Sequence, residues 1–186
     1  MKTKSTLEYA LIGLLNQRAQ SGYDLRKTFT TTAMSNYSDS PGSIYPALRR
    51  LEARGWIEAE APPSGQETDP RKRQVFRLTN SGKAALVAWI EQPIQLQDMA
   101  SQLAELMLRF AFMDGNVPRT TTLRFLEDFE QALGSHIAKL RVQFNDLSAK
   151  YPLHTGTLAF QSGIESMEAQ TAWARQARAR LLENSI

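Results

Sequence analysis

The sequence predicts a mainly α-helical protein with one small β-hairpin, organised in two parts. Apolar residues recur at three- and four-residue spacing through most of the chain, which is the period of a buried helix face. Two short segments, 56–61 and 74–79, instead alternate apolar and polar residues as half-buried strands do. No strand pattern occurs beyond about residue 98. The hairpin therefore belongs to the first part, and the second part is expected to be entirely helical.

Three helices are predicted before the hairpin. The first covers about residues 3–17, and Ser21 can cap a second helix over 22–33. The third begins near residues 42–43 and ends at Gly55, since glycine commonly follows the last residue of a helix. The residues expected to pack are Tyr23, Leu25 and Phe29 on the second helix and Ile44, Ala47, Leu48 and Leu51 on the third.

A fourth helix follows the hairpin, after a Thr or Asn cap at residues 79–80. Pro93 then interrupts the pattern, so we predict two domains, 1–92 and 93–186. In the second, a helix over 118–149 would be about 48 Å long, which is more than a small domain needs internally. Such a helix predicts a partner helix, and a last helix is expected near 157–182. We interpret this part as a helical dimerisation domain, with an effector response left open.

The charge is divided unevenly between the two halves. Residues 1–90 hold 13 Lys and Arg against 8 Asp and Glu, a balance of +5, whereas the remaining 96 hold 9 against 11, a balance of −2. A basic half is a candidate for binding a polyanion. An ordinary solvated surface is the alternative.

Several classes of protein are disfavoured. The chain has no cysteine, so a disulfide framework and a thiolate site are excluded, and the cytosol is the expected location. No run approaches 18 apolar residues, which predicts no membrane span. The basic start resembles a secretory signal, but Glu8 interrupts it and the apolar residues follow a helical period. The two histidines, His136 and His154, have no metal-binding spacing. We therefore expect no enzyme, no metal and no cofactor.

Three helices followed by a hairpin are the order of a winged helix-turn-helix, in which the third helix is the recognition helix and the hairpin is the wing. The third helix has an outer face of polar and cationic residues that could meet a groove and its phosphates. Three consecutive cations at the hairpin tip could contact the DNA backbone. A solvated helix face and a solubilising loop are the alternatives. The candidate DNA-binding residues are Ser43, Tyr45, Pro46, Arg49, Arg50, Arg71, Lys72 and Arg73.

Three segments of the first domain are distinctive and cover most of residues 7–86: YALIGLLNQRAQSGYDLRKTF, SPGSIYPALRRLEARGWIE and RQVFRLTNSGKAAL. In these segments the first domain resembles the PadR-like winged-helix transcriptional regulators. The resemblance implies dimeric repressors that bind operators through the third helix and the wing. It also implies that the helix start at Ser43, Tyr45 and Pro46 lies against DNA, and that small hydrophobic molecules such as phenolic acids release some members.

We therefore predict a homodimeric, ligand-responsive repressor that binds a pseudo-palindromic double-stranded DNA operator. A small hydrophobic or aromatic effector is a candidate partner, and no membrane partner is expected. Trp89, Met107, Phe110 and Trp173 could line its pocket, although plain packing is the preferred interpretation of these residues. The alternative function is a winged-helix protein-interaction module whose basic wing binds an acidic partner.

Overall fold

A computed structural model describes most of the chain, which divides into two compact units. The first unit comprises Met1–Gln92 with Ala104–Phe112, and the second comprises Pro93–Leu103 with Met113–Ile186. The described part is mainly helical with a small antiparallel sheet, which confirms the predicted fold class. The structure describes residues 3–32, 34, 37, 41–60, 74–95 and 103–183.

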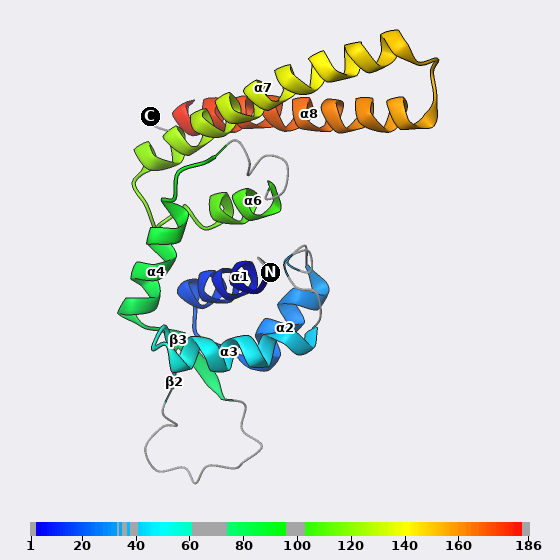
Figure 1. Cartoon of the computed structure of the whole chain (residues 1–186). Helices are drawn as coiled ribbons and strands as arrows, with labels where there is room; N and C mark the ends of the chain where they lie inside the picture. The colour runs from blue at the N-terminus through cyan, green and yellow to red at the C-terminus, as the bar shows by residue number, and fades with distance from the viewer. Residues whose placement is uncertain are drawn as a thin grey trace, which may run out of the picture. The chain divides into compact units, whose positions relative to one another are not determined.

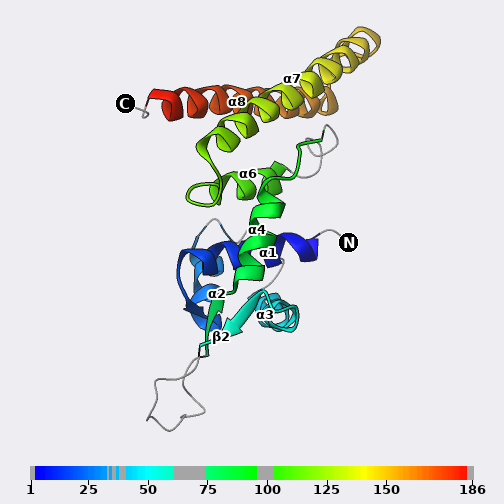
Figure 2. The same ribbon diagram turned by 90° about the vertical axis from the view of Figure 1, so that its left-hand side faces the viewer.

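The first unit is built around α1, which contacts α3, α4 and β3 (Figures 1 and 2). Its strands form a sheet in the order β1-β3-β2, with Ile57 opposite Leu78 and Gln20 opposite Phe76. The two-residue strand β1 was not predicted, because so short a segment shows no alternation. The elements of this unit are α1 (Thr3–Gln17), β1 (Gln20–Ser21), α2 (Gly22–Thr31), the 3₁₀ turn η2 (Pro41–Ser43), α3 (Ile44–Ala53), β2 (Ile57–Ala59), β3 (Val75–Leu78), α4 (Asn80–Ile90) and α6 (Leu103–Ala111).

The predicted helix ends are confirmed by their hydrogen bonds and backbone angles. Ser21 caps α2 by accepting from the backbone N–H of Asp24 at 3.2 Å. Thr79 caps α4 by accepting from the N–H of Gly82 at 3.1 Å. Gly55 follows α3 with a φ of +69°, a conformation that favours glycine because it has no Cβ. The apolar face predicted for α3, from Ile44 to Leu51, is buried in the core.

Helix α6 packs into the first unit, although it lies beyond the predicted domain boundary at residues 92–93. Arg109 of α6 is only 3% exposed, and its Nη2 donates to the carbonyl of Ile90 at 2.9 Å and to that of Gln92. A guanidinium at the end of α4 satisfies carbonyls that have no partner within that helix. Leu106 and Leu108 are buried alongside it. The polypeptide needed for a complete first unit therefore extends to about residue 112.

The second unit is dominated by an antiparallel pair of long helices, α7 (Arg119–Lys150) and α8 (Thr155–Glu183) (Figure 1). Edge-to-face ring pairs lie between them, with centroids 6.4 Å apart for Phe129 with Trp173 and 5.9 Å apart for Phe144 with Phe160. Trp173 therefore takes part in packing, which was the preferred interpretation of its spacing. The ion pairs between the helices are Glu130 with Arg175 at 2.5 Å, Glu127 with Arg178 at 3.6 Å, and Arg141 with Glu168. Within the described residues, no helix is both long and apolar enough to span a membrane.

Candidate nucleic-acid interface

The outer face of α3 gathers several of the predicted DNA-binding residues. Ile44, Ala47, Leu48 and Leu51 are buried on one side of this helix. On the other side Tyr45 is 42% exposed, and Pro46 and Arg49 are also exposed. Ser43 lies half-buried in the 3₁₀ turn that leads into α3. The turn before α3 and the first two turns of the helix thus present a hydroxyl, an aromatic ring and a guanidinium at the surface.

The start of α2 lies against the first turn of α3. A Cβ added at Gly22 would lie 2.8 Å from the ring of Tyr45 and 3.3 Å from Leu48, so glycine permits this close approach. The expectation that Tyr23 packs in the core was wrong, because its side chain is 46% exposed. Tyr23 is therefore a further surface aromatic at the junction of α2 and α3. The helical spacing of Tyr23 with Leu25 and Phe29 places it near the buried face of α2. Spacing alone does not show whether such a residue lies in the core or at the exposed edge of that face.

Arg50 has a partner that sequence reasoning did not find. Its Nε donates to Oε1 of Glu8 at 2.7 Å, and Nη1 of Arg54 donates to Oε2 of the same carboxylate at 2.5 Å. The Glu8 side chain is 6% exposed, whereas that of Arg50 is 40% exposed. Arg49 lies one residue earlier, about 100° around the helix, and is exposed. The adjacent arginines therefore have different surroundings.

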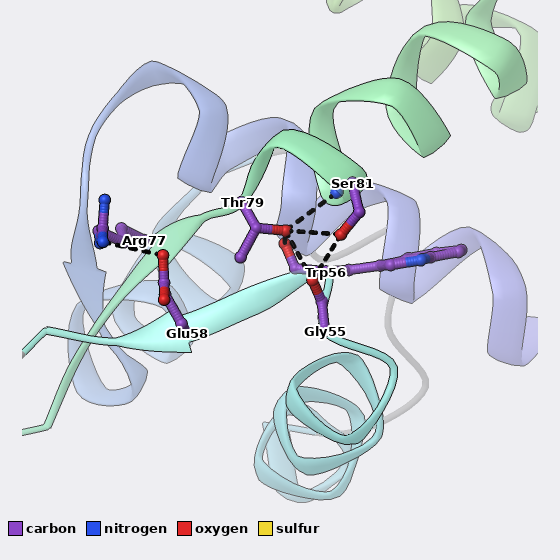
Figure 3. A network of polar contacts seen from close by, with 7 residues as sticks. Gly55, Trp56, Glu58, Arg77, Thr79 and Ser81 are labelled. Atoms are coloured by element: carbon purple, nitrogen blue, oxygen red, sulfur yellow. Dashed lines mark hydrogen bonds and ion pairs between the residues drawn. The ribbon is translucent and has the colours of Figure 1, made fainter.

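The root of the wing is held to α4 by side-chain hydroxyls (Figure 3). The hydroxyls of Thr79 and Ser81 each donate to the carbonyl of Gly55 at 2.6 Å, and the N–H of Thr79 donates to the carbonyl of Trp56 at 3.0 Å. Farther along the strands, Arg77 pairs with Glu58 across β3 and β2 at 2.9 Å. The wing cations Arg71, Lys72 and Arg73 lie outside the described residues, so their predicted role stays a prediction.

Aromatic rings connect the end of α3 to α4. The guanidinium carbon of Arg54 lies 5.3 Å from the centre of the Trp56 ring, and Trp56 contacts Tyr9 with centroids 6.0 Å apart. Tyr9 stacks on Trp89 at 4.5 Å and 3°, and burial raises the pKa of its phenol. Trp89 is 2% exposed and donates from Nε1 to Glu105 at 3.3 Å. Trp89 is thus part of the packed core, as the preferred interpretation held.

Comparison with known proteins finds a family match for part of this unit. Residues 11–88 match the model of the transcriptional regulator PadR-like family. Over these residues the chain is similar to the PadR-like family. The predicted resemblance is thereby confirmed, and the match runs from within α1 to within α4, so it includes α3 and the strands at the root of the wing.

Two curated relatives are similar to about half of this chain. The negative transcriptional regulator PadR of Bacillus subtilis (strain 168) is 33% identical over 90 residues, which are 47% of this chain and 48% of that protein. The probable transcriptional regulator Rv1176c of Mycobacterium tuberculosis is 28% identical over 88 residues, 47% of this chain and 45% of the relative. The matches thus span about half the length of these relatives. These relatives are transcriptional regulators rather than enzymes, which confirms the expectation that the chain is not an enzyme.

Solved structures of PadR are similar along most of the chain at low identity. The crystal structure of Bacillus subtilis PadR in complex with operator DNA is 24% identical and has a TM-score of 0.41, covering 94% of this chain and 98% of that one. The structure of Bacillus subtilis PadR in complex with p-coumaric acid is 23% identical and has a TM-score of 0.42, covering 97% and 98%.

Proposed function

We propose that this PadR-like chain is a sequence-specific DNA-binding transcriptional regulator that acts as a ligand-responsive repressor in the cytoplasm. The observation that carries the proposal is the outer face of α3, where Tyr45, Pro46 and Arg49 are exposed above a fully buried apolar face. The family match and the regulatory relatives support the same function. An effector that is small and hydrophobic or aromatic remains the predicted ligand.

In the proposed complex the first turns of α3 enter the major groove. Ser43 and Tyr45 position the helix start, while Arg49 reaches a base edge, where a guanidinium can donate two hydrogen bonds to guanine. Pro46 lies in the first turn of α3, where its missing N–H costs no intrahelical bond. Arg71, Lys72 and Arg73 bind the backbone from the wing. The cations supply affinity, whereas the groove contacts supply sequence preference.

The test is DNA binding by the full chain at about 150 mM salt, where non-specific affinity is much reduced. The probes are the region upstream of the protein's own gene and a shuffled fragment of equal composition. We expect a preference of about a hundredfold or more for the upstream region. If that region is bound no better than the shuffled one, selection from random genomic fragments follows. Failure to enrich any sequence would contradict the proposal and favour the protein-interaction module.

A single substitution on α3 provides the matched comparison. Arg49→Ala should lower the preference by about one to two orders of magnitude, because one groove contact is lost. Lys139→Ala removes one exposed cation from α7 and should leave the preference unchanged.

We also propose that the chain forms a homodimer through its second unit. The two copies of α3 would then contact two half-sites of a pseudo-palindromic operator, about 34 Å apart or a multiple of that distance. The support is the number of large apolar side chains that α7, α8 and their connection leave exposed. Sedimentation equilibrium of the full chain is expected to give twice the chain mass of 20.9 kDa. A monomer at concentrations of tens of micromolar would contradict this assembly. The exposed residues are Val142, Leu147, Tyr151, Leu153, Leu158, Trp173 and Leu182.

A further inference from the structure

A buried carboxylate of α1 binds two arginines, one within α3 and one at the C-cap of that helix. Glu8 is almost fully inaccessible, and its two oxygens accept from Arg50 and Arg54 at 2.7 and 2.5 Å. A charged group in such a place is stable only when it is paired and hydrogen-bonded. Because the pairs are charge-assisted and engage both oxygens, they restrain the arginines more than an exposed ion pair would.

The position of these arginines on α3 explains what the pairing achieves. Arg50 and Arg54 are four residues apart and therefore share one face of the helix, on the side of α1. Arg49 lies on the exposed side. Glu8 thus distinguishes two arginines that are paired with it, with side chains 40% and 47% exposed, from Arg49 on the outer face of α3.

The same contacts reach the wing. Arg54 lies over the ring of Trp56, the residue directly before strand β2, and Trp56 in turn contacts Tyr9, the neighbour of Glu8. Adjacent residues of α1 therefore hold both the end of α3 and the start of the wing strand. A change at Glu8 is expected to act on the orientation of both elements.

We propose that Glu8 is a positioning residue for DNA recognition, which sets the orientation of α3 on α1 and keeps Arg50 and Arg54 away from the phosphate backbone. This inference rests on the proposed function, and it replaces the predicted phosphate contact of Arg50. Cations that reach phosphates raise affinity for every DNA sequence and steepen its salt dependence. Pairing two of them with Glu8 therefore favours the specific complex relative to the non-specific one.

The experiment compares Glu8→Gln with the unaltered full chain on the preferred DNA fragment and on its shuffled control, over a range of salt concentrations. The neutral amide should release the arginines, so the slope of log K against log salt should steepen by about one to two units. Affinity for the shuffled fragment should rise severalfold, and the preference should fall about tenfold. Adding Arg50→Gln to Glu8→Gln should bring the slope back by about one unit.

Glu52→Gln is the matched control, because it removes the same charge from an exposed position on α3 and should leave slope and preference unchanged. Equal effects of Glu8→Gln and Glu52→Gln would overturn the proposal, since they would reflect net charge alone. Weaker binding to both fragments with an unchanged slope would also overturn it and indicate a purely structural role. An unaltered chain without any sequence preference would instead refute the proposed function itself. If Glu8→Gln does not fold, Glu8→Asp keeps the charge but shortens the reach, and it should steepen the slope by about one unit.

Discussion

Replacing Gly82 with alanine is expected to lower the free energy of unfolding of the first unit by about 3 to 5 kcal/mol. A Cβ at this position would lie 2.1 Å from the carbonyl oxygen of Trp56 and 2.7 Å from the side chain of Leu78. Since the nearest atom belongs to the backbone, the strand or the helix must move. That movement would break the bonds by which Thr79 and Ser81 join the wing root to α4. The wing root would therefore lose its hydrogen bonds to α4 while the first unit loses stability.

Thermal and chemical unfolding followed by tryptophan fluorescence will measure this effect, because Trp56 and Trp89 both lie in the first unit. Gly134→Ala is the matched control. Gly134 lies within α7 with open space around the added Cβ, so alanine should stabilise the helix by about 0.5 to 1 kcal/mol. A Gly82→Ala protein as stable as the unaltered chain would contradict the close packing of α4 on the wing root.

Replacing Arg71, Lys72 and Arg73 together with alanine is expected to weaken DNA binding about a hundredfold at 150 mM salt. Each phosphate contact contributes about 0.9 to the slope of log K against log salt, so the slope should fall by about two to three units. The loss should be equal for preferred and shuffled DNA, because phosphate contacts carry no sequence information. Binding titrations over a salt series on both fragments will measure slope and preference together.

A second triple variant tests whether the position of these cations matters. Arg124, Lys139 and Lys150 are exposed cations of α7, and replacing them with alanine removes the same charge from the second unit. This variant should retain the slope of the unaltered chain. If both triple variants reduce the slope equally, the wing is not a specific contact and only the net charge acts.

Much of the N-terminal fold could be predicted because its signals are local. The cap at Ser21, the turn at Gly55 and the cap at Thr79 each depend on a residue's own hydrogen bonding or backbone freedom within a few positions. The buried face of α3 follows from the 3.6-residue period alone. Tyr45, Pro46 and Arg49 could be placed on the opposite face for the same reason.

The sequence by itself determined the order of the helices and of the two wing strands, the helix ends and the two faces of α3, because these depend on spacing and on neighbouring residues. Only the tertiary structure decided the partners. Glu8 binds Arg50 across 42 positions of sequence, and Arg109 brings α6 into the first unit by binding the end of α4. Periodicity shows that a residue faces inward but not which residue it meets, since the packing of distant segments brings the two together.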